Sequence, residues 1–178
     1  MNAFDNQNTM QTPRQTNPNE GVPPSNSPQG SPAGMFEGGK IVKTEVCEDQ
    51  RLDFLPWKLP NGFFSFENLV YSYMDHLCEE YDGGYWDFYD LSNGGFFMAL
   101  HTEDDSMMIR GLDNGYEAAM SPEAAGVVVT LYALSHMLND PRFTKEEESE
   151  TRLHDHYWRL REFADQHLES RKIRGAID

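Results

Sequence analysis

The strongest constraint on the fold is a pair of aromatic-rich apolar runs within residues 81–99, joined by the sequence Ser-Asn-Gly-Gly. The dipeptide Asn93-Gly94 favours a tight β-hairpin, because both central residues of a type I′ turn need positive φ and these residue types tolerate it. Upstream, Gly83-Gly84 separates the runs from the segment before them. The stretch therefore predicts two antiparallel strands with a short turn.

The first 39 residues differ in composition from the rest of the chain. They contain six of the ten prolines, six asparagines and only isolated apolar residues, so no apolar face exists there whose burial could offset the entropy of ordering. We expect residues 1–39 to form a disordered polar tail and residues 40–178 to form a single domain. The tail lacks a basic start followed by an apolar block, which argues against a signal peptide.

The sequence disfavours membrane insertion and disulfide bonding. The longest mainly apolar run, residues 124–134, has about half of the roughly 20 residues that a spanning helix needs. Cys47 and Cys78 are the two cysteines of the chain, and they lack the spacing of a metal or redox pair. We therefore expect a cytoplasmic protein with two reduced thiols and no membrane contact.

Charge is distributed unevenly along the chain. The net charge is −16, and residues 44–148 hold 21 acidic against five basic residues, whereas the segments on either side are balanced. Nucleic acid and anionic membrane would repel such a chain, so we expect no direct binding of nucleic acid. A basic protein surface would attract it, and the DNA channel of a DNA-handling enzyme is one such surface.

Apolar periodicity predicts the other elements. Residues 65–81 have apolar side chains at helical spacing, with Ser65 as N-cap, and residues 150–168 repeat this pattern. Residues 124–137 are apolar on nearly all sides and follow Ser-Pro-Glu, a typical helix start, so they should form the buried central helix. Gly126 within this helix indicates close packing against another backbone. Alternation and turn signals predict short strands at three further places, namely residues 40–46, 106–112 and 116–120.

Three shorter segments complete the fold prediction. The apolar run 54–60 is interrupted by two prolines and is interpreted as a linker that packs over the core. Residues 113–115, Asp-Asn-Gly, predict a second tight turn, and residues 173–178 a short docked terminus. The order of elements indicates the α+β class: one domain with an antiparallel sheet of about four strands, connected as a meander by tight Asn-Gly turns and packed against about three helices.

No group of residues has the pattern of a catalytic or cofactor site. Asp87 and Asp90 have opposite parity on the predicted strand and so point to opposite faces, and Asp82 precedes the glycine pair. None of the six histidines has a partner at metal-ligand spacing, and the sequence contains no Gly-x-Ser-x-Gly motif. We therefore predict no metal, no cofactor and no enzymatic activity.

Three blocks of the sequence resemble the ArdB/KlcA-type antirestriction family. The first block contains the predicted hairpin, the second begins the central helix and the third lies in the last long helix. The matching residues of the first block are Met74-Asp75-x-Leu77-Cys78-x-x-Tyr81-x-Gly83-Gly84-x-Trp86-x-Phe88-Tyr89-x-Leu91-x-Asn93-Gly94-Gly95-Phe96-x-Met98-Ala99. Those of the second are Met120-Ser121-Pro122-Glu123-Ala124-Ala125-Gly126, continuing to Leu131-Tyr132 and Ser135-His136, and those of the third are Tyr157-x-x-Leu160-Arg161-x-Phe163-Ala164-x-x-His167 with Ala176-Ile177-Asp178. An upstream piece at residues 49–54 is also similar.

The resemblance implies a compact α+β protein from a plasmid or other mobile element. Such a protein protects incoming mobile-element or phage DNA by inhibiting host type I restriction-modification enzymes, which would be its direct or indirect partner in the bacterial cytoplasm. The resemblance implies no catalytic residue and no cofactor. Two alternatives stay open: an acidic adaptor or partial DNA mimic that binds another DNA-handling complex, and a hydrolase that uses Asp82 or Asp87 with a nearby histidine.

The acidic excess around the hairpin suggests how a non-catalytic inhibitor would act. We expect inhibition to depend on an acidic surface that attracts a basic enzyme surface over a Debye length of about 8 Å. The candidate partner-binding residues are Asp82, Asp87, Asp90, Glu103, Asp104 and Asp105, with Asp178 as a further candidate at the C-terminus.

Overall fold

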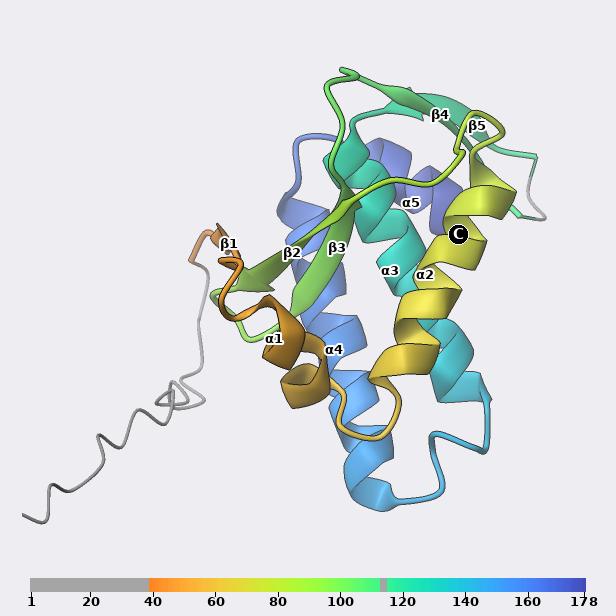
Figure 1. Ribbon diagram of the computed structural model, residues 1–178. Coiled ribbons are helices and arrows are strands. Elements are labelled where there is room, and N and C mark those ends of the chain that lie inside the picture. Colours follow the sequence, from red (N-terminus) through yellow and green to blue (C-terminus); the bar gives the residue numbers. More distant parts are fainter. Residues whose placement is uncertain (1–38, 113–114) are drawn as a thin grey trace, which may run out of the picture. The chain divides into compact units, whose positions relative to one another are not determined.

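The computed structural model describes residues 39–112 and 115–178. Within them the elements follow the order β1, α1, α2, β2, β3, β4, β5, α3, α4, α5 (Figure 1). All of the predicted tail except Gly39 lies outside the described residues, as do Asp113 and Asn114 of the predicted second turn. The predicted α+β class with antiparallel strands is confirmed.

The described strands form two small sheets rather than one. The first sheet has the order β1–β2–β3 and consists of Lys43–Glu45, Trp86–Leu91 and Phe96–Leu100. The second sheet pairs β4, Met107–Arg110, with β5, Glu117–Met120. All pairs of described strands are antiparallel. The predicted strands are present, but the prediction that they form one meandering sheet is wrong.

Helix α3, Pro122–Asn139, explains why β4 does not extend the first sheet. It packs against β3 on the side where a fourth strand would pair. The N–H of Met98 donates a hydrogen bond to Thr130 Oγ1 at 3.2 Å. A Cβ on Gly126 would overlap the carbonyl oxygen of Met98 and lie 2.7 Å from the Cα of Ala99. The helix therefore takes the place of a strand, and the close approach predicted for Gly126 is confirmed.

Helix α3 is the buried centre of the domain, as predicted from its sequence. It lies between α2, Phe63–Leu77, and α4, Glu147–Gln166, and it also contacts α5, Ser170–Ile177 (Figure 1). The predicted N-cap of α3 is confirmed, because Ser121 Oγ accepts a hydrogen bond from the N–H of Ala124 at 3.2 Å. The structure has more helices than the three predicted, since α1 and α5 are helical too.

Helix α1, Arg51–Lys58, corrects the interpretation of residues 54–60 as a linker. Pro56 lies inside the helix, where it removes the one N–H that would bond four residues back. Burial of Phe54 and Leu55 against the core compensates for that loss, because each removes a large apolar side chain from water. The second helix also begins earlier than predicted, after Gly62, so Ser65 is not its N-cap.

The turn between β2 and β3 differs in length from the predicted one. Leu91 N–H donates to the carbonyl of Gly95 at 3.0 Å, and Gly94 N–H donates to the carbonyl of Leu91 at 2.7 Å, so the loop has three residues rather than two. Gly94 has a φ of 85°. Asn93 uses its amide to anchor the hairpin to α4, donating to the carbonyl of Arg159 at 2.8 Å. These tertiary contacts of Asn93 are not visible in a local turn pattern.

We expect Gly94→Val to lower the free energy of unfolding by about 1 to 3 kcal/mol, because a β-branched residue at positive φ is strained. Gly94→Asn is the matched control, since asparagine tolerates this conformation better. Urea unfolding of both variants measures the difference. Equal stability of the two variants would contradict the structural role assigned to this turn.

Candidate interaction surface

The aromatic residues of the hairpin belong to the core. Trp86, Phe88 and Phe96 are buried on the face covered by α1 and α2, where Phe88 stacks on Phe54 with ring centroids 5.9 Å apart. On the opposite face, Phe97 stacks on Phe163 of α4 at 5.4 Å. Rings packed in this way are not available to stack on nucleic-acid bases, so the hairpin works as a scaffold.

Asp90 is tied to a buried cation and is not a free surface acid. The side chain of Lys58 is only 3% exposed, and its Nζ donates to Asp90 Oδ1 at 2.6 Å and to the carbonyl of Gly94 at 3.2 Å. Burial lowers the pKa of Lys58, and the Asp90 carboxylate partly opposes this effect. The pair joins α1 to the hairpin. Three aromatic rings also face the ammonium group, those of Trp57, Phe54 and Phe96.

Asp87 points to the other face of the sheet, as its parity predicts. Its Oδ2 lies 2.9 Å from His101 Nδ1, and this hydrogen bond raises the pKa of His101. The Asp87 side chain is 15% exposed, whereas that of His101 is 68% exposed. An aspartate–histidine pair can activate a nucleophile, but no hydrogen bond links His101 to a serine, threonine or cysteine among the described residues. Asp87 therefore holds the end of β3 to β2.

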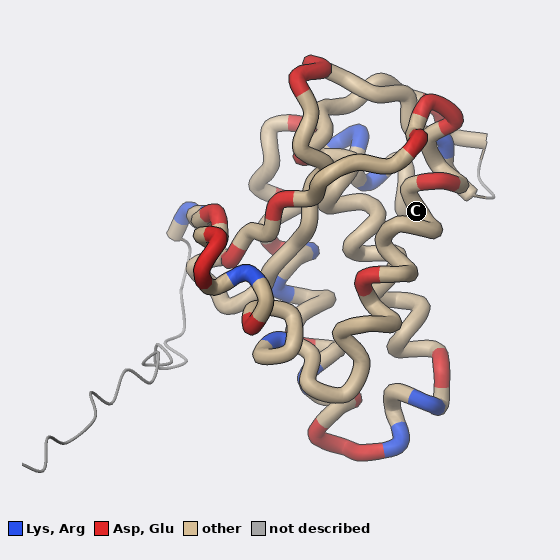
Figure 2. The backbone as a smooth tube through the Cα atoms, viewed as in Figure 1, with Lys and Arg blue, Asp and Glu red and all other residues tan. Residues whose placement is uncertain are grey.

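The remaining candidate acids lie on loops. Asp82 precedes β2, and Glu103, Asp104 and Asp105 lie between β3 and β4; all four are exposed. Figure 2 shows acidic segments on the loops near β4 and β5, and another acidic run at the start of α4 at the opposite end of the domain. Asp178 is exposed and lies apart from the hairpin in sequence, 3.5 Å from Arg161. The candidates thus divide into four exposed loop acids, two acids with structural partners and the C-terminal residue.

A second polar cluster joins the start of α3 to the segment between α4 and α5. Ser121 Oγ donates to the carboxylate of Glu169, and Lys43 pairs with Glu123. His167 Nδ1 accepts from the N–H of Glu169 at 3.0 Å, so Nε2 carries the proton that faces Glu123 Oε1 at 3.3 Å. The hydrogen bond to His167 lowers the pKa of Glu123.

This cluster combines serine, histidine and glutamate without forming a nucleophile. The Ser121 hydroxyl proton goes to Glu169 rather than to His167, and its oxygen caps α3. The cluster instead fixes the C-terminal helices against the central helix. Several residues of the second and third family blocks therefore have structural roles.

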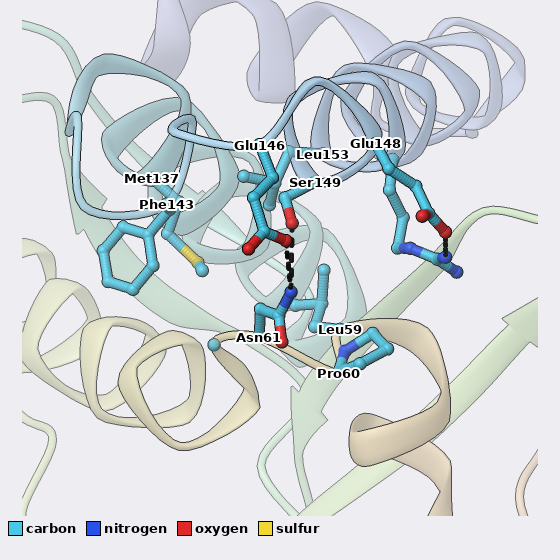
Figure 3. A pocket seen from close by; sticks show the side chains of 11 residues that line it. Leu59, Pro60, Asn61, Met137, Phe143, Glu146, Glu148, Ser149 and Leu153 are labelled. Atoms are coloured by element: carbon cyan, nitrogen blue, oxygen red, sulfur yellow. Dashed lines mark hydrogen bonds and ion pairs between the residues drawn. The ribbon is translucent and has the colours of Figure 1, made fainter.

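The pocket drawn in Figure 3 has a volume of about 100 Å³ and lies between the α1–α2 connection and the start of α4. Its lining includes the apolar side chains of Leu59 and Met137. Asn61 Nδ2 donates across it to Glu146 Oε2 at 3.3 Å and to Ser149 Oγ at 3.2 Å. Its polar groups are thus bonded to one another rather than directed at a ligand. Among the described residues no group of three metal-ligating side chains could hold a metal ion, and no helix is long and apolar enough to cross a membrane.

His156 is a buried residue whose place in the core was not predicted from the sequence. It lies on the inward face of α4, with Nε2 3.1 Å from the carbonyl of Lys58 and its ring edge-to-face with Phe96. Its Nδ1 has no hydrogen-bond partner among the described residues. Burial lowers the pKa of His156 to about 3. Its helical spacing from Leu153 and Leu160, both buried, is the signal that could have identified it.

We expect His156 to make the domain less stable as the pH falls. The unfolded chain takes up this proton below its ordinary pKa of 6.5, whereas the folded chain resists protonation down to about pH 3. Within that window His156 should lower the free energy of unfolding by up to about 1.4 kcal/mol for each unit by which the pH falls. His156→Phe should flatten the slope of stability against pH between 6.5 and about 4.5, measured by urea unfolding. An unchanged slope in that variant would show that other groups cause the dependence.

Comparison with known proteins decides the family. A model of the family described as antirestriction protein matches residues 79–178, more than half of the chain. The chain belongs to the antirestriction protein family. It is 40% identical over 141 residues to the antirestriction protein KlcA of Escherichia coli, a match that covers 78% of this chain and 94% of the relative. The family predicted from the three sequence blocks is confirmed.

Two further similarities extend over most of the domain. The uncharacterized protein YafX of Escherichia coli K12 is 38% identical over 159 residues, covering 87% of this chain and 93% of that protein. A solved structure of the KlcA and ArdB proteins superposes with a TM-score of 0.71 at 39% identity and covers 80% of this chain and 98% of its own. Those two proteins show antirestriction activity against type I DNA restriction systems in vivo but not in vitro.

Proposed function

We propose that this antirestriction protein protects incoming mobile-element or phage DNA by lowering type I restriction in the bacterial cytoplasm, and that residues 40–178 form the antirestriction domain. The observation that carries the proposal is similarity at 39 to 40% identity over nearly the full length of relatives, which include the KlcA and ArdB proteins active against type I systems. Identity at this level, with a shared fold, supports a shared activity.

The proposed inhibition is non-catalytic. The polar clusters of the described residues support this, because each of their carboxylates and histidines is directed at a neighbour that stabilises the fold. Lys58 and Asp90 fix α1, and the Ser121 and Glu123 contacts fix the C-terminal helices. No cofactor is needed for such a protein.

The partner is the host type I restriction-modification enzyme, reached directly or through another host component. The relatives' activity in vivo but not in vitro favours a requirement for something present in the cell. The net charge of −16 opposes direct binding to DNA and favours a basic protein surface. An acidic adaptor or partial DNA mimic that acts on another DNA-handling complex is the alternative.

Phage plating tests the function. Unmodified phage is plated on cells that contain a type I system, with and without the expressed protein, and on the same cells without the restriction genes. The proposal predicts that expression restores plating toward the level of the cells without restriction genes. Unchanged restriction in the presence of soluble, folded protein would refute the function, and equal relief of a type II system would favour the alternative.

Four exposed acids are the proposed contact surface: Asp82, Glu103, Asp104 and Asp105. They lie on loops near the hairpin and, apart from the hydrogen bonds between Asp104 and Thr102, their side chains have no hydrogen bond or ion pair within the described part of the chain. The proposed contact surface does not include Asp87 and Asp90, because their carboxylates bind His101 and Lys58 within the fold. Asp178 stays a separate candidate.

A further inference from the structure

The two edges of the three-stranded sheet differ in how they are covered. The outer edge of β3 is covered by α3, where Thr130 accepts the hydrogen bond of Met98 N–H. At the other edge, β1 has all three of its residues exposed and pairs only with β2 among the described strands (Figure 1). An exposed strand edge presents backbone groups that can pair with another strand.

The hydrogen-bond pattern identifies the free backbone groups of β1. Val46 N–H donates to the Phe88 carbonyl at 2.8 Å, and the Val42 carbonyl accepts from Ser92 N–H at 2.9 Å. Along β1, every second residue directs its N–H and C=O groups toward β2, and the residues between them direct these groups away from the sheet. Val42 and Val46 face β2, so Lys43 and Glu45 direct their N–H and C=O groups outward. These four groups have no partner among the described residues.

The next residue whose backbone faces outward is Ile41, and its N–H already has a hydrogen-bond partner within the chain. Its N–H donates to Oε1 of Gln166 at 2.9 Å, and Gln166 Nε2 donates to the carbonyl of Gly39 at 3.4 Å. The free edge is therefore limited to Lys43 and Glu45. Any strand that uses both residues must be centred opposite Thr44.

The sequence of the edge, Val42-Lys43-Thr44-Glu45-Val46, is complementary to itself in the antiparallel direction. With Thr44 opposite Thr44 of a second copy, Lys43 of each chain lies opposite Glu45 of the other, and Val42 lies opposite Val46. Opposite charges, threonine pairs and apolar pairs are each favourable across strands. Val42, which is 56% exposed in the single chain, would gain an apolar neighbour.

We infer that two copies of this chain associate through β1 about a twofold axis, forming one continuous antiparallel sheet of six strands. The two outward residues on each chain allow four backbone hydrogen bonds. Lys43 already pairs with Glu123 of its own chain, so in the dimer each Lys43 is shared between Glu123 and Glu45 of the other copy, and this charge pairing sets the register. The interface is isologous, with the same surface contributed by both copies. It lies outside residues 79–178, the part that matches the family model, and it does not depend on the proposed function.

Such an interface is small, so the dimer is weak. Pairing through one short strand buries less than the roughly 1,200 Å² of a standard stable interface. The like net charge of the two copies also opposes association, although salt at physiological strength screens it beyond about 8 Å. We therefore expect a monomer at low concentration and a dimer that becomes populated at high concentration.

Sedimentation velocity of the full chain tests this inference between about 10 μM and 1 mM, since complexes with interfaces this small dissociate in that range. The average mass should rise with concentration from the monomer value of 20.4 kDa toward twice that value. Glu45→Lys places lysines opposite one another, and Lys43→Glu places glutamates opposite one another. Each variant alone should therefore stay monomeric over the same range.

A mixture of the two variants provides the matched control. Lys43→Glu copies and Glu45→Lys copies again place opposite charges across the strands, so the mixture should form dimers although neither variant does so alone. Melting temperatures of the two variants show that the fold is retained. If the mass of the wild type stays at the monomer value over the whole range, the inference is overturned. This result is also the one expected if another segment of the same chain covers β1. A dimer that both variants retain would also overturn it.

Discussion

Gly126→Ala should destabilise the domain by roughly 3 kcal/mol or more, because the new Cβ would collide with backbone rather than with a movable side chain. The Cβ would overlap the Met98 carbonyl oxygen and lie 2.7 Å from Ala99 Cα. Relief requires α3 to move away from β3, which would also break the hydrogen bond between Met98 and Thr130. Alanine favours a helix over glycine by about 1 kcal/mol, so the clash must exceed that gain.

Thermal and urea unfolding measure this effect. Gly39→Ala is the control, because no atom lies within 4 Å of a Cβ built at that position. A loss of roughly 3 kcal/mol corresponds to a melting temperature lower by about 10 °C for a domain of this size. If Gly126→Ala were as stable as the wild type, α3 could not pack on β3 as closely as the structure shows.

Asp90→Ala should cost more stability than Lys58→Met, although both remove the same ion pair. The side chain of Lys58 is 3% exposed and that of Asp90 is 43% exposed. Without Asp90 the buried ammonium group keeps the carbonyl of Gly94 as its one hydrogen-bond acceptor among the described residues, and we expect a loss of about 2 to 3 kcal/mol. Without Lys58 the carboxylate is hydrated, and methionine fills most of the volume, so the loss should be below about 1.5 kcal/mol.

The pH dependence of Asp90→Ala provides a second readout. Burial already lowers the pKa of Lys58 below its usual 10.5, and removal of the carboxylate lowers the pKa further. Between that folded-state pKa and 10.5 the unfolded chain binds the proton and the folded chain does not, so stability rises with pH. Asp90→Ala should therefore regain stability relative to the wild type as the pH increases toward about 10. Lys58→Met should show no such recovery, and an equal response of both variants would contradict the assignment.

Sequence patterns predicted the elements better than their assembly. Helical periodicity and the Ser121 cap identified α3, because burial and capping leave local signals. The pairing of β4 with β5 alone depends on α3 occupying the edge of β3, a contact between distant segments that no local pattern contains. Helix α1 was missed because Pro56 obscured it, although burial of Phe54 and Leu55 supports the helix in three dimensions.

The candidate surface was predictable only in part. Charge counts located the acidic region, and the alternation of side chains along the strand correctly placed Asp87 and Asp90 on opposite faces of the sheet. The partners of these two acids lie in other segments, His101 directly after β3 and Lys58 at the end of α1. The sequence therefore did not show that both acids are bound within the fold. The family blocks identified the protein class, yet many of their residues stabilise the hairpin and the C-terminal helices.

The central claim is that the acidic loops near the hairpin carry the inhibition, and one comparison tests it most directly. The test variant combines Asp82→Asn, Glu103→Gln, Asp104→Asn and Asp105→Asn. The control changes four exposed glutamates at the opposite end of the domain to glutamine, namely Glu146, Glu147, Glu148 and Glu150 (Figure 2). Both variants reduce the net charge equally, and circular dichroism verifies that both are folded.

The measurement is the plating efficiency of unmodified phage on type I restricting cells that express the wild type or either variant at equal levels. Each exposed ion pair contributes below about 1 kcal/mol to the free energy of binding, so loss of four such pairs should reduce protection by on the order of tenfold or more. The account predicts this loss for the loop variant and near wild-type protection for the control. Full protection by the loop variant, or equal loss in both variants, would contradict it.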